Sequence, residues 1–160
     1  MEAIVHMLNM VRGLHAKTDS TCIVRGSQMG IFVVARVFIK ADDCVVVEAL
    51  GNPLAREVFS NCGAKVLSVS HDAEGIDVEN LAQLCRIHKI RAVYVTPHHH
   101  LPTTVVMSKT RRKKLLALAG KYDFLIIEDD NDHEFNFSHI ATLPIASLAN
   151  SNRVIYRIAF

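Results

Sequence analysis

The stretch Phe124-Leu125-Ile126-Ile127-Glu128-Asp129-Asp130 places four consecutive apolar residues directly before three acids. A continuous apolar run without alternation is typical of a strand that is covered on both faces, as in a parallel sheet. Val45-Val46-Val47 and Ala92-Val93-Tyr94-Val95 repeat this pattern earlier in the chain. These runs predict the centre of a parallel sheet with an acidic group at one strand end.

Helix-period segments separate the runs, which predicts an α/β domain. We expect strands at Thr21–Val24, Cys44–Glu48, Lys65–Val69, Ala92–Thr96, Phe124–Glu128 and Arg153–Tyr156, and helices at about 2–12, 28–39, 53–61, 78–88 and 109–121. The expected fold has three layers, with a mostly parallel sheet flanked by helices. A chain of 160 residues can bury one sizeable core but hardly two, so we expect a single domain over 1–160.

The composition excludes several classes of protein. Hydrophobic residues make up 50% and charged residues 21%, with a formal net charge of +2, so neither disorder nor a strong field for nucleic acid is expected. No apolar run approaches the roughly 20 residues that span a bilayer, and the N-terminus has no basic signal-peptide region. Four cysteines without a CxxC pair suggest reduced thiols. We therefore expect a cytoplasmic protein without membrane contact.

Ligands of parallel sheets bind beyond the carboxyl ends of the strands, so the loops at that edge are candidate site segments. Gly26-Ser27-Gln28 opens a predicted helix, where backbone N–H groups and the serine hydroxyl could bind an anion, or Ser27 could simply cap the helix. The acids from Glu128 to Glu134 could pair with a protonated ring nitrogen, ligate a hard cation or form a solvated loop.

Two further stretches, one of adjacent histidines and one of basic residues, do not indicate a ligand site. The adjacent His98, His99 and His100 point in different directions and cannot easily ligate one ion, so we expect no metal site there. The basic run Lys109–Lys114 precedes leucines of the same predicted helix. Its charges should therefore form the solvated first turns of that helix, with no direct contact to DNA.

Together these segments resemble the aminotransferase-like domain of MocR-type regulators of the GntR family, within the fold-type I pyridoxal-phosphate enzymes. The resemblance extends from about Glu2 to Phe160. It rests on five segments in the same order, which are Gly26-Ser27-Gln28, Glu48 with Gly51-x-Pro53, Tyr94-Val95-Thr96-Pro97-x-His99-x-x-Pro102-Thr103, Ile126–Asp130 with Asp132 and Glu134-Phe135, and Arg153–Tyr156. It implies the large-domain fold of these enzymes, a pyridoxal 5'-phosphate cofactor and an amino-acid-like ligand.

The resemblance also implies roles for individual residues. Ser27 and Gln28 match the segment that holds the cofactor phosphate. Asp129 matches the aspartate that pairs with the pyridinium nitrogen and keeps the ring protonated. Thr96 and His99 match the loop that flanks the ring.

Departures from the family pattern imply that cofactor binding is weak or lost. Asn52 stands where the family has an aromatic residue stacking on the ring, and Asn131 where it has a tyrosine that hydrogen-bonds the ring hydroxyl. Each lost contact removes roughly 1–3 kcal/mol. The Schiff-base lysine of the family would lie two positions beyond Phe160, so we assign no catalytic residue and expect a truncated, catalytically incompetent domain without the family's winged-helix and C-terminal small domains.

Two other functions stay open. The chain could be a non-catalytic interaction module, such as a homodimer or a subunit completed by another chain, or a metal-dependent phosphotransfer or hydrolase domain that uses Asp129, Asp130 and the histidines. In the family, the strand that matches Thr21–Val24 pairs with a strand that follows the lysine. We therefore expect this strand to be unpaired, docked elsewhere or covered by a partner chain.

Overall fold

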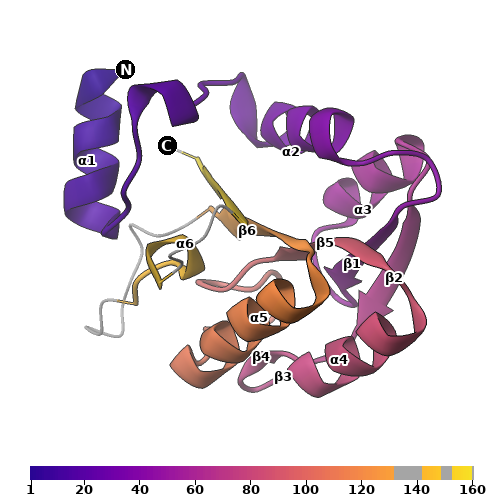
Figure 1. The fold of residues 1–160 in the computed structure, drawn as a ribbon. Helices are drawn as coiled ribbons and strands as arrows, with labels where there is room; N and C mark the ends of the chain where they lie inside the picture. The colour runs from indigo at the N-terminus through magenta and orange to yellow at the C-terminus, as the bar shows by residue number, and fades with distance from the viewer. Residues whose placement is uncertain (132–141, 149–152, 160) are drawn as a thin grey trace.

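The centre of the fold is a five-stranded sheet in the order β2-β1-β5-β6-β7, and every neighbouring pair in it is parallel (Figure 1). The structure is a computed structural model that describes residues 1–131, 142–148 and 153–159. The strands are β1 (Cys44–Glu48), β2 (Lys65–Val69), β5 (Ile90–Val95), β6 (Leu125–Asp130) and β7 (Val154–Ile158), with a separate antiparallel hairpin of β3 (His71–Asp72) and β4 (Gly75–Ile76). The predicted α/β class and five of the six predicted strands are confirmed.

Helices cover both faces of the sheet. The helices of the described residues are α1 (Glu2–Arg12), α2 (Gly26–Phe38), α3 (Pro53–Asn61), α4 (Val78–Ile87), α5 (Lys109–Tyr122) and α6 (Ile145–Leu148), and of these α1 contributes to neither core. Val46 and Val93 belong to the core on the side of α4 and α5, whereas Val45 and Tyr94 belong to the core on the side of α2 and α3. Because alternate residues of a strand face opposite sides, the two cores make the three layers that the sequence predicts.

Side-chain caps explain where three of the helices begin. Asn52, Asp77 and Ser108 accept hydrogen bonds from the first backbone N–H groups of α3, α4 and α5. Ser27 behaves differently, because α2 already begins at Gly26 and has no side-chain cap. Gly26 has a φ of 74°, a conformation that suits glycine, and this turn brings the chain into the helix before Ser27. The prediction that Ser27 caps this helix is therefore wrong.

The predicted strand Thr21–Val24 does not belong to a sheet. It follows the short 3-10 helix η1 (Thr18–Ser20), and among the described residues it pairs with no strand. Ile23 is 61% exposed. A β-branched stretch becomes a strand only when a neighbouring strand accepts its backbone hydrogen bonds. The strand prediction is therefore wrong, and in the described part of the chain the segment is unpaired, the first of the three expected alternatives.

The basic run at the start of α5 is partly buried. Arg112 is 1% exposed, and its guanidinium donates to the backbone carbonyls of Pro97, Met107 and Leu143. Arg111 donates to the carbonyl of Ile76 over 2.6 Å. The interpretation of Lys109–Lys114 as solvated turns is therefore wrong for these two arginines, because they hold the neighbouring loop and hairpin to the helix.

The carboxyl end of β6 is longer than predicted and includes Asp129 and Asp130. The acids Asp132 and Glu134, which belong to the predicted loop, lie outside the described residues. Within the described ranges, none of the helices combines the length and the apolar character that crossing a bilayer requires.

Candidate functional site

Four buried carboxylates lie where the parallel strands end. Glu48 ends β1, and Glu128, Asp129 and Asp130 end β6; each is at most 2% exposed. A buried carboxylate is costly unless a cation or hydrogen-bond donors compensate it. The groups that face each carboxylate therefore determine what this edge of the sheet can bind.

Asp129 is paired with groups from two neighbouring strands. The Tyr94 hydroxyl donates to its Oδ2, and Nη2 of Arg157 donates to its Oδ1. Burial raises the pKa of Tyr94 to about 12, so the hydroxyl remains protonated and can donate at neutral pH. Arg157 also donates to Oδ1 of Asn131. The structure thus brings Asp129 and Asn131, two predicted cofactor residues, together around an arginine that the sequence analysis did not identify.

The predicted phosphate segment borders this pair. Ser27 and Gln28 lie in the first turn of α2. One turn further on, α2 packs against Arg157, since a Cβ atom at Gly30 would lie 3.3 Å from Cδ of Arg157. The start of α2 and the carboxylate of Asp129 therefore share Arg157 as a neighbour.

The other three predicted residues take different positions. The side chain of Asn52 caps α3, and it also lies near the Tyr94 hydroxyl. Thr96 donates its backbone N–H and its hydroxyl to Glu48. His99 is half-buried. Its roles and those of the other predicted residues toward a cofactor stay predictions.

Two more arginines compensate the remaining acids of β6. Arg12, at the end of α1, donates to Asp130, which also accepts from the Tyr156 hydroxyl over 2.5 Å. Glu128 accepts from the first backbone N–H groups of α6 and lies 4.0 Å from Nη1 of Arg112. These pairs join residues far apart in the chain, so no local sequence signal could have identified them.

Glu48 faces imidazoles instead of an arginine. Its Oε1 lies 3.7 Å from Nε2 of His71, and its Oε2 lies 3.7 Å from Nε2 of His100. Burial raises the pKa of Glu48 to about 7 and lowers the pKa of His100 to about 4. The sequence analysis missed this cluster because His71 reaches it through the hairpin β3–β4, whose strands have only two residues each.

The side chains as they stand do not fit pyridoxal phosphate in the implied manner. A protonated ring nitrogen needs the negative charge of Asp129, but the guanidinium of Arg157 already neutralises this charge and Tyr94 donates to the second oxygen. Arg157 therefore supplies from within the chain the positive partner that the family's cofactor would supply. The ring nitrogen could take this place only if Arg157 moved.

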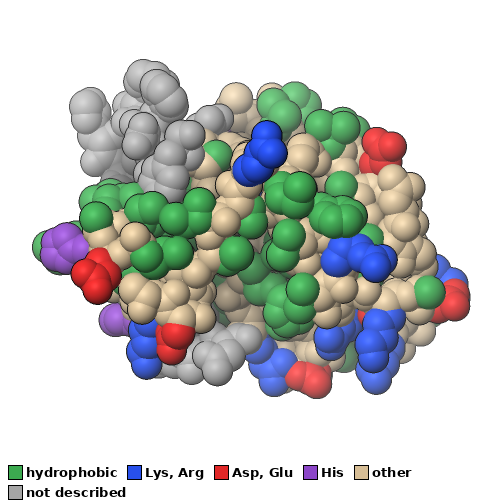
Figure 2. Space-filling model, turned by 90° about the horizontal axis from the view of Figure 1, so that it is seen from above, with side chains coloured by type: hydrophobic (Ala, Val, Ile, Leu, Met, Phe, Trp, Pro, Cys, Tyr) green, Lys and Arg blue, Asp and Glu red, His purple; other side chains and the backbone are tan. Residues whose placement is uncertain are grey.

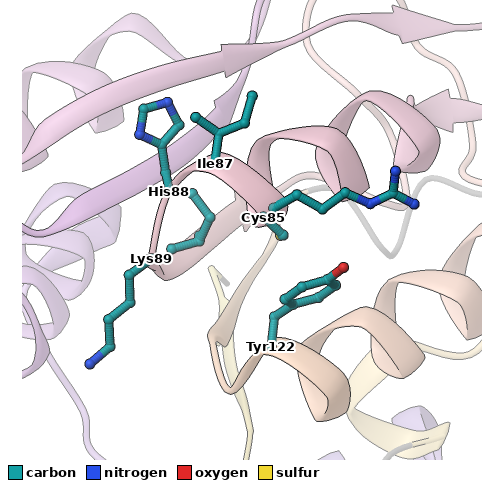
Figure 3. Close-up of a pocket in the computed structure, with 7 residues that line it drawn as sticks. Cys85, Ile87, His88, Lys89 and Tyr122 are labelled. Atoms are coloured by element: carbon teal, nitrogen blue, oxygen red, sulfur yellow. The ribbon is translucent and has the colours of Figure 1, made fainter.

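A shallow hollow of about 300 Å³ lies elsewhere, between the end of α4, the start of β5 and Tyr122 at the end of α5 (Figure 3). Its lining includes Cys85, His88 and Lys89. Because it lies where β5 begins, it is at the amino edge of the sheet, opposite the buried carboxylates. None of the predicted site residues contributes to it.

Comparison with known proteins identifies a family and two kinds of relative. The family model described as aminotransferase class I and II matches residues 2–152. The HTH-type transcriptional regulator TauR of Rhodobacter capsulatus is 33% identical over 156 residues, 98% of this chain and 31% of the regulator. The aromatic-amino-acid aminotransferase 1 of Thermococcus litoralis is 35% identical over 136 residues, 82% of this chain and 33% of the enzyme.

A second regulator and a solved structure are also similar to this chain. The probable rhizopine catabolism regulatory protein MocR of Rhizobium meliloti is 27% identical over 154 residues and 96% of this chain. The kynurenine aminotransferase of Pyrococcus horikoshii superposes with a TM-score of 0.91 at 34% identity, over 97% of this chain and 39% of that chain. The chain thus spans about a third of the length of these curated relatives. The resemblance to MocR-type regulators and the fold-type I fold are confirmed.

Proposed function

Because the chain belongs to the aminotransferase class I and II family, we propose that it is a catalytically incompetent aminotransferase-like domain in which binding of pyridoxal phosphate is weak or lost. Its ligand would be an amino-acid-like small molecule. The observation that supports this function best is the pair of Arg157 and Asp129. The start of α2 keeps the backbone N–H groups that could hold a phosphate, whereas the group for the ring nitrogen is already paired.

The energetic cost of opening this pair opposes the cofactor. The side chain of Arg157 is 9% exposed and that of Asp129 is fully buried. Separating a buried pair leaves an uncompensated charge, at a cost of about 3–5 kcal/mol. Asn52 and Asn131, in place of the family's stacking ring and tyrosine, offer no large apolar contact in return.

Titration of the chain with pyridoxal phosphate, followed by absorption and by equilibrium dialysis, tests the proposal. We expect weak binding by the wild type and binding about 100-fold tighter or more by Arg157→Met, since this substitution frees Asp129 without the cost of opening the pair. The double variant Arg157→Met with Asp129→Asn should lose the gain. Arg153→Met is a matched control, because Arg153 lies just before the same strand and pairs with Asp123 instead. Tight binding by the wild type, or no gain in a folded Arg157→Met, would contradict the proposal.

A second candidate function, an interaction module that forms a homodimer, is favoured by exposed apolar side chains of α1, of α2 and of the segment between them. Met10, Val11, Ile23, Met29, Phe32 and Val37 are each at least 44% exposed and belong to α1, α2 or the segment between them. Figure 2, which looks from above onto the side where α2 lies in Figure 1, shows hydrophobic side chains gathered over the middle of that view. Such surfaces commonly bind other proteins.

Light scattering across a wide range of protein concentration tests self-association. We expect a dimer that Phe32→Glu dissociates, because a carboxylate would have to be buried in the contact. Ile87→Glu, at a residue of α4 that is 74% exposed, should leave the dimer intact. A monomer at all concentrations would exclude the homodimer.

A further inference from the structure

Glu48, His71 and His100 bring three potential ligand atoms together at the carboxyl edge of the sheet. One atom from each side chain lies within 4.8 Å of the other two. The residues come from the end of β1, from β3 and from the loop after β5, so only the fold makes them neighbours. Their side chains are 1%, 3% and 0% exposed.

Two polar atoms of the cluster have no hydrogen-bond partner among the described residues. They are Oε1 of Glu48 and Nε2 of His100, and both are buried. The separations of 3.7 Å between Glu48 and each imidazole are too long for hydrogen bonds. A buried polar atom without a partner costs about 1–3 kcal/mol. A cationic group between the three side chains would satisfy these unpartnered atoms.

Neighbouring groups hold these ligand atoms in place. Thr96 donates two hydrogen bonds to Oε2 of Glu48, at 2.9 and 2.7 Å, which leaves Oε1 free. Nδ1 of His100 lies 2.7 Å from the Thr103 hydroxyl, which directs Nε2 toward Glu48. The rings of His71 and His100 stack at 3.8 Å. Metal-ligating histidines are commonly oriented by such a hydrogen bond on the second ring nitrogen.

We propose that Glu48, His71 and His100 bind a divalent transition-metal ion, with Zn²⁺ as the ion that best suits the ligand set. Two imidazoles and one carboxylate are a common set for zinc, and they leave a fourth position for water or a ligand. At metal–ligand distances of about 2.1 Å, tetrahedral ligand atoms lie about 3.4 Å apart. Each imidazole Nε2 lies 3.7 Å from one oxygen of Glu48, and the three ligand atoms lie within 4.8 Å of one another, so binding requires an inward movement in which the stacked rings turn toward the ion. This site uses only one of the three adjacent histidines, so the argument against a site within that loop does not apply to it.

Calorimetric titration of the metal-free chain with Zn²⁺ alone, and absorption spectra with Co²⁺, test the site. We expect the wild type to bind one ion per chain, with Co²⁺ bands typical of low coordination number. His100→Gln and His71→Gln should each weaken Zn²⁺ binding at least about tenfold. His99→Gln is the matched control, because His99 neighbours His100 but is not in the cluster; it should bind as the wild type does.

The melting temperature supplies a second measurement, since an ion that binds only the folded chain raises it. Zn²⁺ should raise the melting temperature of the wild type and of His99→Gln, but not that of His71→Gln, which keeps the loop after β5 unchanged. If the wild type binds no Zn²⁺, or if His71→Gln and His100→Gln bind it as well as His99→Gln does, the proposal is wrong. None of these outcomes depends on whether pyridoxal phosphate binds.

Discussion

The buried carboxylates at the ends of strands β1 and β6 have different neighbouring groups. At the end of β6, Asp129, Asp130 and Glu128 each face an arginine of the same chain. At the end of β1, Glu48 accepts two hydrogen bonds from Thr96 and otherwise faces two imidazoles. Because a buried carboxylate is stable only when its charge is compensated, the arginines close the β6 end to an external cation, whereas the β1 end can accept one. We infer that the two ends have different ligands.

The largest expected change in the free energy of unfolding comes from removing an arginine at the end of β6, which would leave a carboxylate there without an arginine, as at the end of β1. Arg112→Met removes three hydrogen bonds to backbone carbonyls and the cation nearest Glu128. We expect the free energy of unfolding, measured by urea denaturation, to fall by about 3–5 kcal/mol. Lys113→Met, at the exposed neighbouring position, should change it by less than about 0.5 kcal/mol. A similarly small change in the free energy of unfolding for both variants would show that Arg112 does not stabilise the end of β6.

A smaller effect concerns the acid stability of the β6 end. His98 faces Asp130, Arg12 and Arg112, and burial lowers its pKa to about 4, although Asp130 opposes this shift. The unfolded chain has a histidine pKa of about 6.5, so between these values the native state binds fewer protons and the free energy of unfolding falls as the pH falls. The loss is on the order of 3 kcal/mol by the lower end of this range.

Substitution isolates this contribution. His98→Asn should lose less stability than the wild type when the pH is lowered from about 6.5 to about 4, in urea denaturation at each pH. His99→Asn, at the half-buried neighbour, should keep the wild-type dependence. Equal pH dependence of the two variants would show that His98 does not remain neutral beside the arginines.

The smallest expected effect concerns the hydrogen exchange of backbone amides in two segments of the chain. The segment Thr21–Val24 has no strand partner among the described residues, whereas Val45–Val47 pair on both sides within the sheet. We expect amide hydrogen exchange of Thr21–Val24 near the unprotected rate, with an opening free energy of about 0–1 kcal/mol, and strong protection of Val45–Val47. Strong protection of Thr21–Val24 in a monomer would indicate a pairing that is absent among the described residues.

Local sequence pattern was sufficient for most of the fold. Continuous apolar runs such as Val45–Val47 identify strands with two covered faces, and the caps Asn52, Asp77 and Ser108 identify helix starts, because these properties depend on residues close in the chain. The same reasoning failed at Thr21–Val24, because strand formation also needs a distant partner.

The carboxylates at the strand ends, Asp129 among them, follow from the sequence alone, since a parallel sheet places the ends of its strands at one edge. Only the tertiary structure decided which cation each one meets. Arg157 reaches Asp129 from the neighbouring parallel strand β7, and His71 reaches Glu48 through a hairpin. The compensation of a buried charge depends on groups within a few ångströms in space, and sequence distance does not determine these neighbours.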